Sequence, residues 1–268
     1  MKSNDFTNIA AKYERDSLIQ KSAAEKLIGL LDIQRDDDVL DLGCGTGALA
    51  RKIRSMTDGN VVGVDPSTGM ISEAGSGRQG LSITYDVKTA EELGYRDRFT
   101  VIFCNSAFQW FRDPAWSLKN CHAALRKGGR MGIQAPAKKV YCPNFLKAID
   151  AVATDARTST TFAEFTAPWL FFDSPEEYSA LFEHAGFSAP FSVIEEIRTF
   201  HSPDEVMTIF ESGAAAGYLN QDYYTALVDD AYTAAFREIV RKSFREQANG
   251  DGKVELIFNR IYLVAMKE

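Results

Sequence analysis

The chain has 268 residues, a length that suits one large domain or a core with a smaller second part. Its formal net charge of −7 is unfavourable for general binding to nucleic-acid phosphates. No apolar run reaches the roughly 18 residues of a membrane-spanning helix, and the N-terminus lacks the apolar stretch of a signal peptide. We therefore expect a cytoplasmic protein that binds neither nucleic acid nor membrane.

Helices and strands alternate along the first half of the chain. Residues 5–31 carry apolar side chains at helical spacing and predict a helix. Short apolar runs predict strands at 39–42, 60–64, 81–85, 99–104 and 130–134, with helices at 48–56, 69–74 and 114–125 between them. Such alternation over residues 36–136 predicts a doubly wound α/β fold with a mostly parallel sheet and right-handed crossovers.

The pattern changes after Pro136. Residues 143–186 are rich in aromatic side chains and predict mostly helix, and a long helix is predicted over 222–246. Two further strands are expected at 191–200 and 254–266. We therefore divide the chain into an α/β core with an N-terminal lid helix (1–136), a helical cap insert (137–190), and the last two strands with cap helices between them (191–268).

The run Asp41-Leu42-Gly43-Cys44-Gly45-Thr46-Gly47-Ala48 directly follows the first strand. Three glycines at alternate positions allow the backbone to turn sharply and to approach a ligand closely, because three side chains are missing. The amide groups of the turn and of the next helix's first residues then point toward that ligand.

Polar residues follow the next three predicted strands. Asp65 lies 18 residues after Gly47, where a carboxylate can accept hydrogen bonds from ribose hydroxyls. Asp86 follows the third strand and can accept from an adenine amino group, and Asn105 follows the fourth strand. All of them fall at carboxyl ends of parallel strands, which is where open α/β sheets bind ligands.

Gly43, Gly45 and Ala48 also fit the dinucleotide pattern G-x-G-x-x-A, so a dehydrogenase is one alternative. A dinucleotide would place its pyrophosphate at the helix N-terminus. Asp41, immediately before the glycines, is a poor neighbour for a pyrophosphate but suits a positively charged ammonium group. The residues therefore favour a nucleoside that carries an amino acid over a dinucleotide.

Several of these segments resemble the motifs of class I S-adenosylmethionine-dependent methyltransferases. Residues 39–48 are similar to their first motif, and 61–65 with Pro66, Ser67 and Met70 to their second. Residues 105–110 and 125–129 are similar to the segments after strand four and before strand five. The resemblance implies a seven-stranded, mostly parallel, Rossmann-like sheet with a helical cap between strand five and the last strand.

The resemblance also implies S-adenosylmethionine as the cofactor. Asp65 and the glycine segment would hold it, Met70 would pack on the adenine, and Asp86 would bind the adenine edge. The residues expected around the cofactor are Asp41, Gly43, Cys44, Gly45, Gly47, Asp65, Pro66, Met70, Asp86, Val87, Asn105 and Ser106. On the substrate or lid side we expect Tyr13, Phe108, Gln109 and Trp110, although aromatic side chains near a site are often packing residues.

A narrower resemblance concerns Phe108-Gln109-Trp110, the mid-chain insert and residues 256–265, which look like trans-aconitate and malonyl-carrier-protein methyltransferases. It suggests O-methylation of a carboxylate on a small or carrier-bound acid. A phenol, an amine or a carbon atom of a natural-product or quinone-type acceptor is the alternative, and a non-catalytic cofactor-binding regulatory protein is another. The oligomeric state stays open between monomer and homodimer, because the aromatic cap could also form a dimer surface.

The catalytic residues are not identified by the sequence. A carboxylate acceptor is already ionised at neutral pH and needs no base; a phenol or alcohol would need one, and His201 is then the candidate. Arg198 and Lys139 are possible cationic anchors for a carboxylate. The four cysteines, Cys44, Cys104, Cys121 and Cys142, lack zinc-ligand spacing, so no metal site is expected, and Cys44 is interpreted as chosen for its size.

Overall fold

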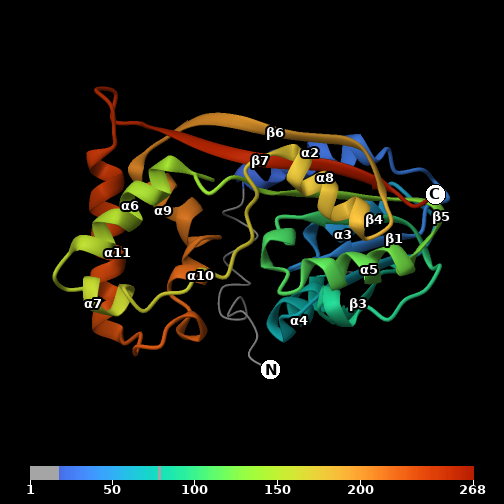
Figure 1. Cartoon of the computed structure of the whole chain (residues 1–268), viewed down its shortest axis with the longest axis horizontal. Helices are drawn as coiled ribbons and strands as arrows, with labels where there is room; N and C mark the ends of the chain where they lie inside the picture. The colour runs from blue at the N-terminus through green and yellow to red at the C-terminus, as the bar shows by residue number, and fades with distance from the viewer. Residues whose placement is uncertain (1–17, 78–79) are drawn as a thin grey trace. The chain divides into compact units, whose positions relative to one another are not determined.

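The structure is a computed structural model that describes residues 18–77 and 80–268. Within them one seven-stranded sheet has the order β3-β2-β1-β4-β5-β7-β6 (Figure 1). The strands are β1 (Val39–Leu42), β2 (Val61–Asp65), β3 (Thr84–Val87), β4 (Phe99–Asn105), β5 (Leu125–Pro136), β6 (Ser188–His201) and β7 (Val254–Met266). The first five strands pair in parallel, whereas β7 runs antiparallel to β5. The predicted doubly wound, mostly parallel sheet is therefore confirmed.

The chain divides into two compact units. The sheet unit comprises, among the described residues, 18–77, 80–139, 169–195 and 260–268, and the helical unit comprises 140–168 and 196–259. Strands β6 and β7 each have residues in both units. Residues 169–195, most of which the sequence assigned to the cap insert, thus group with the sheet.

The sheet unit has helices on both faces. Successive side chains along a strand point to opposite faces, so each strand presents side chains that helices can cover on both sides. Its helices are α2 (Leu18–Leu31), α3 (Ala48–Arg54), α4 (Thr68–Gly77), α5 (Pro114–Ala124) and α8 (Pro175–His184), with short 3₁₀ turns η1 (Ala90–Glu92) and η2 (Phe108–Trp110). Val39 packs with Leu27 and Leu31 of α2 on one face. Its neighbour Leu40 belongs to the cluster on the opposite face, which contains residues of α5 and α8.

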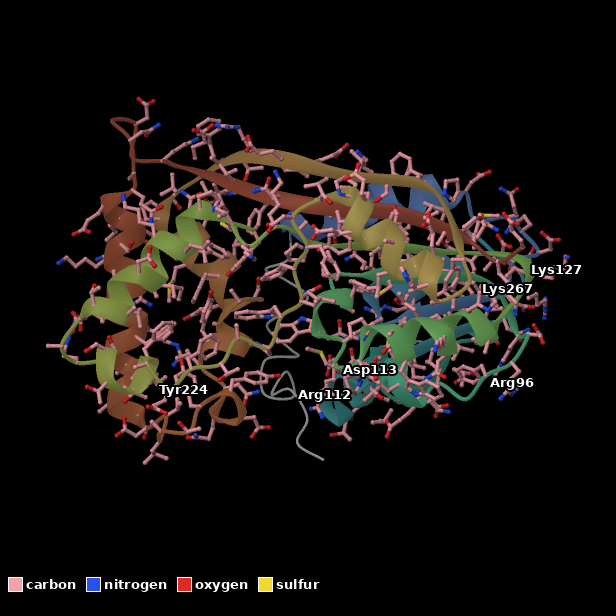
Figure 2. All side chains as sticks on the ribbon, viewed as in Figure 1. Arg96, Arg112, Asp113, Lys127, Tyr224 and Lys267 are labelled. Atoms are coloured by element: carbon pink, nitrogen blue, oxygen red, sulfur yellow. The ribbon has the colours of Figure 1, made fainter. Side chains whose placement is uncertain are left out.

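The helical unit is built around aromatic side chains. It contains α6 (Pro143–Thr154), α7 (Ser159–Phe162), α9 (Pro203–Glu211), α10 (Ala215–Tyr218), η3 (Gln221–Tyr223) and α11 (Asp230–Glu246). Phe145 lies at its centre, with ring centroids 5.1 Å from Phe210, 5.7 Å from Phe244 and 5.4 Å from Phe258. Tyr224, labelled in Figure 2, is also buried, and its hydroxyl donates to the carbonyl of Tyr218 at 2.6 Å.

The helix predicted over 222–246 and the mostly helical stretch predicted over 143–186 both contain fewer helical residues in the structure than the sequence suggested. The helix predicted over 222–246 begins only at Asp230, because the Asp229 side chain accepts a hydrogen bond from the Tyr232 amide and caps it there. Residues 163–174 between α7 and α8 are not helical. None of the described helices combines the length and the apolar character needed to cross a bilayer.

Candidate active site

A five-residue turn joins β1 to α3. Its glycines, Gly43, Gly45 and Gly47, have φ angles of 79°, 52° and 76°, a region that residues with a Cβ atom disfavour. The amides of Gly43 and Cys44 donate to the carbonyl of Val64 at 2.8 and 3.0 Å. The turn is thereby tied to the end of β2 and lies at the carboxyl edge of the sheet.

The three glycines serve different purposes. A Cβ atom on Gly43 would lie 2.3 Å from the Cβ of Ala107, and one on Gly47 would lie 2.4 Å from the hydroxyl of Tyr85. These two positions need glycine because protein atoms fill the space beside them. Among the residues that the structure describes, none has an atom within 4 Å of a Cβ placed on Gly45. The open space beside Gly45 is therefore where a ligand can approach the main chain.

Asp65, the last residue of β2, faces this turn. Its Oδ2 accepts a hydrogen bond from the Gly45 amide at 3.0 Å, and its Oδ1 accepts one from the Ser67 amide at 2.9 Å. Burial raises the pKa of Asp65, and the two amides oppose that shift. A carboxylate has about four lone-pair sites, so Asp65 can accept further hydrogen bonds from a ligand.

Asp41 lies on β1 with 2% of its surface exposed. Its Oδ2 atom is buried and has no hydrogen-bond partner within the described part of the chain. Burial, together with the nearby charge of Asp65, raises the pKa of Asp41 to about 8. A buried carboxylate without a partner is unfavourable, so a cationic group of a ligand would stabilise its charged form.

Cys44 is a packing residue of the turn. Burial, and the carboxylates of Asp41 and Asp65, raise the pKa of its thiol, which therefore stays protonated and is a poor nucleophile. A Cβ atom on Gly63 of β2 would lie 2.9 Å from the Cys44 sulfur, so the thiol is in close contact with that strand.

The residues expected near the adenine differ in exposure. Asp86 and Val87 lie on the edge strand β3 and are exposed, and Val87 pairs in register with Asp65. The Asp86 carboxylate accepts a hydrogen bond from the Tyr95 hydroxyl at 3.4 Å. Pro66 is also exposed, whereas Met70 is 2% exposed. In this arrangement Pro66, Asp86 and Val87 offer surface to a ligand and Met70 offers almost none.

The segment after β4 carries two buried oxygen atoms that have no hydrogen-bond partner among residues 18–77 and 80–268. These are Asn105 Oδ1, at the end of β4, and Gln109 Oε1, within η2. Gln109 donates through Nε2 to the carbonyl of Ser106 at 2.9 Å. Ser106 in turn donates through its amide to the carbonyl of Gln134 at 2.7 Å and through its hydroxyl to Oε1 of the same residue at 3.0 Å.

Aromatic residues beside this segment have two different environments. Phe108 has no exposed surface and stacks on Phe182 at 5.8 Å, so it packs in the core instead of facing an acceptor. Trp110 is half-buried, and its ring lies 5.6 Å from that of Trp169. Trp169 in turn stacks on Phe171 at 6.3 Å. We did not single out Trp169 and Phe171 as site residues from the sequence, since they lie 59 residues or more from Trp110 along the chain.

Other predicted candidates lie outside this arrangement. Tyr13 falls outside the described residues. His201 belongs to the helical unit, where its Nε2 is buried without a hydrogen-bond partner. Arg198, also in the helical unit, pairs with Glu196 and Glu255. Lys139 is exposed at the end of the sheet unit.

Residues 39–129, which include the glycine turn, Asp65 and the segment after β4, match the family model described as Methyltransferase domain. Together with the fold, the comparisons support a class I S-adenosylmethionine-dependent methyltransferase. This family assignment agrees with the order of the seven strands and with a site at the carboxyl edge of the parallel strands.

Two curated methyltransferases illustrate the similarity. The malonyl-[acyl-carrier protein] O-methyltransferase of Calditerrivibrio nitroreducens is 32% identical over 131 residues, which are 47% of this chain and 50% of that protein. The chain thus spans about half the length of the curated relatives that it matches in this group. The trans-aconitate 2-methyltransferase of Deinococcus radiodurans is 25% identical over 269 residues, and the alignment covers 96% of each chain.

A solved structure extends the similarity of the fold. The YcgJ protein from Bacillus subtilis superposes with a TM-score of 0.62 at 17% identity, over 92% of this chain and 99% of that one. At this identity the likeness concerns the fold alone.

Proposed function

We propose that this methyltransferase binds S-adenosylmethionine at the glycine turn and transfers its methyl group to a carboxylate oxygen of a small or carrier-bound acid. The observation that carries the proposal is the open space beside Gly45, bordered by Asp65.

The residues around the turn fit S-adenosylmethionine better than a dinucleotide. Asp41 offers a buried, unpartnered carboxylate oxygen, which is favourable for an ammonium group and unfavourable for a pyrophosphate. Asp65 has acceptor capacity left for two ribose hydroxyls. Asp86 and Val87, exposed beside Asp65 on the edge strand, are the residues we expect at the adenine.

The carboxylate acceptor is inferred from the relatives and from the chemistry of the site. The malonyl-carrier-protein and trans-aconitate enzymes are named for acceptors that carry carboxylates. The three histidines of this chain lie in α5 (His122), in α8 (His184) and at the end of β6 (His201), and none lies in the turns that directly follow β1, β2, β3 or β4. A carboxylate is already ionised at neutral pH, so its methylation needs no general base in those segments.

When bound, the cofactor supplies a methyl group on a positively charged sulfur. A carboxylate oxygen forms the new bond to the methyl carbon while the carbon–sulfur bond breaks, and the electron pair stays on sulfur. No proton moves, and the products are a methyl ester and S-adenosylhomocysteine. The task of the chain is therefore to align the two partners and to exclude water. Asp65 and the turn fix the nucleoside end, and Asp41 fixes the amino-acid end.

The test is transfer of a tritiated methyl group to a panel of acceptors. The panel contains trans-aconitate, linear dicarboxylic acids, malonyl-loaded acyl carrier protein, phenols and amines. We expect label on the acids only, and we expect base to release it as methanol because methyl esters hydrolyse readily. Label that resists base would exclude a carboxylate acceptor and point to a phenol, an amine or carbon. Tight cofactor binding with no transfer to any acceptor would support a regulatory protein instead.

A further inference from the structure

An extended segment of the sheet unit, Trp169-Leu170-Phe171-Phe172, lies against the turn η2. The amide of Leu170 donates to the carbonyl of Gln109 at 3.0 Å. At the other end, the carbonyl of Phe172 accepts a hydrogen bond from the amide of Lys138 at 2.9 Å. These two bonds hold the segment beside the residues that follow β4.

Side chains alternate along this segment, as in any extended chain. Leu170 and Phe172 pack against the hydrophobic core of the sheet unit. Trp169 and Phe171 are not part of that cluster; their rings stack on each other with planes 20° apart, and Trp110 meets Trp169 edge-on. We name Trp110, Trp169 and Phe171 the aromatic wall. All three side chains are half-buried and neutral.

A polar atom accompanies the wall. Gln109, next to Trp110, is 6% exposed. Its amide orientation is fixed, because only the NH₂ group can donate to the carbonyl of Ser106. The oxygen Oε1 is therefore a true acceptor, and it is buried with no partner from any residue that the structure describes. Such an atom favours a ligand that brings an N–H or O–H group.

The segment that carries Trp110 contacts the glycine turn through Ala107. Gly43 has no room for a Cβ atom because Ala107 fills that space, so the turn and the segment after β4 are in direct contact. Trp110 follows Ala107 by three residues. Arg112 and Asp113, labelled in Figure 2, follow Trp110 by two and three residues. The Asp113 side chain caps α5 by accepting a hydrogen bond from the Trp116 amide at 2.9 Å.

We propose that the aromatic wall is the acceptor-binding surface and that Gln109 orients the acceptor on it. The wall selects acids that carry an apolar chain or a flat unsaturated segment beside the reacting carboxylate. An N–H or O–H donor in that portion of the acid would bind to Gln109. Indole and phenyl faces stabilise such groups, whereas a small polyacid has additional charges that these neutral side chains do not pair. This inference rests on the proposed function and names its substrate class.

The distribution of tryptophan allows a direct test. The chain has three tryptophans, and two of them are in the wall. The third, Trp116, is 52% exposed on α5 and serves as the matched control. Trp116→Phe leaves only wall tryptophans as fluorescent reporters, and the double variant Trp110→Phe/Trp169→Phe leaves only Trp116.

Butyrate, hexanoate and octanoate are titrated into these proteins with and without S-adenosylhomocysteine, and trans-aconitate is titrated for comparison. In Trp116→Phe we expect saturable fluorescence changes and an affinity that rises about two- to fourfold per methylene group. The double variant is expected to show no response from Trp116. Trp169→Ala should lose the dependence on chain length, and Trp116→Ala should keep it.

Gln109 is tested with acceptors matched in length. Wild type should bind N-pentanoylglycine, which has an amide N–H and the same number of chain atoms as octanoate, about tenfold more tightly than octanoate. Gln109→Leu should remove that preference but keep the chain-length series.

Equal affinity for octanoate and trans-aconitate, or a chain-length series unchanged by Trp169→Ala, would overturn the inference. Calorimetry with S-adenosylhomocysteine separates this failure from that of the proposed function. If wild type does not bind S-adenosylhomocysteine, the proposed cofactor site is wrong. If all variants bind it as wild type does, the cofactor site is intact, and the fatty-acid series then tests only the role of the aromatic wall.

Discussion

Asp41 is the residue whose environment most needs a ligand. It is buried on a central strand, one of its oxygens has no partner, and Asp65 adds a second negative charge nearby. Because its folded-state pKa of about 8 lies above the ordinary 3.8, the unliganded protein holds a proton on Asp41 at neutral pH. The contribution of the Asp41 carboxyl group to the free energy of unfolding is therefore greatest below pH 4 and is lost as the pH rises through 8.

This proton predicts pH-dependent binding. The ammonium group of S-adenosylhomocysteine should pair with ionised Asp41, so binding at pH 7 should release close to one proton. The affinity should then rise by about tenfold per pH unit between pH 6 and 7. Calorimetry in buffers of different ionisation enthalpy measures both effects. Asp41→Asn should bind more weakly at pH 7.5 and show no such slope; an equally flat profile in wild type would contradict the role of Asp41.

The open space beside Gly45 gives a second prediction at this scale. Gly45→Ala adds a methyl group where no atom of a described residue lies within 4 Å, so we expect the affinity for S-adenosylhomocysteine to fall at least tenfold. Gly252→Ala is the matched control, because Gly252 also has a positive φ of 72° and open space beside it. Both variants pay a similar backbone cost of about 1 kcal/mol, measured by urea denaturation. Equal affinities in the two variants would show that no ligand occupies the space.

At the residue scale, the sequence was sufficient to predict the site residues whose positions follow from their spacing within one local motif. The three glycines and Asp65 lie together because a strand–turn–helix motif and a second parallel strand bring them together. The distinction among the glycines could not be predicted, since it depends on Ala107, which follows β4, and on Tyr85, which lies on β3. The lack of a partner for Asp41 also depends on the whole surrounding structure.

At the scale of elements, the segment before α8 departs most from prediction. Residues 143–186 were predicted to be mostly helical, with a helix that starts at Ser174, and the capping box of Ser174 and Glu177 does fix the start of α8 there. The residues before it are extended, with alternate side chains in the core. Helical periodicity and strand alternation are hard to separate in a short run of aromatics, so the wall could not be predicted.

The end of β4 supplies a prediction about backbone strain. Ser106 has a φ of 56°, a left-handed conformation that costs a non-glycine residue about 1 kcal/mol. Ser106→Ala keeps this strain and loses the hydroxyl bond to Gln134, whereas Ser106→Gly loses the same bond but relieves the strain. We expect the glycine variant to be more stable than the alanine variant by about 1 kcal/mol in urea denaturation. The reverse order would show that the segment does not hold this conformation in solution.

At the scale of the whole molecule, the chain passes between its two units several times. It crosses at residues 139–140, 168–169, 195–196 and 259–260, and two of these crossings lie within β6 and β7. Neither unit is therefore a single continuous stretch of sequence. The division into three parts that the sequence suggested already drew the cap from two stretches, the insert at 137–190 and the helices between the last two strands, but it did not place crossings within β6 and β7.

This interleaving predicts one cooperative unfolding transition. Each unit has a helix that begins with a capping box, at Ser174 in the sheet unit and at Ser202 in the helical unit. Ser174→Ala and Ser202→Ala remove equivalent hydrogen bonds, and each should cost about 1 kcal/mol. Both should shift the same single transition, monitored by circular dichroism. Two transitions, each shifted by only one variant, would show that the units unfold separately.

The most direct test of the account is calorimetric binding of S-adenosylhomocysteine to wild type, Asp65→Ala and Asp58→Ala. Asp58 is the matched control, because it lies just before β2 with its side chain 77% exposed, whereas Asp65 ends that strand at the turn. We predict binding to wild type, unchanged affinity in Asp58→Ala, and a loss of at least tenfold in Asp65→Ala, with no binding of NAD to any of them. No binding to wild type, or equal affinity in the two variants, would contradict the assignment of the cofactor site.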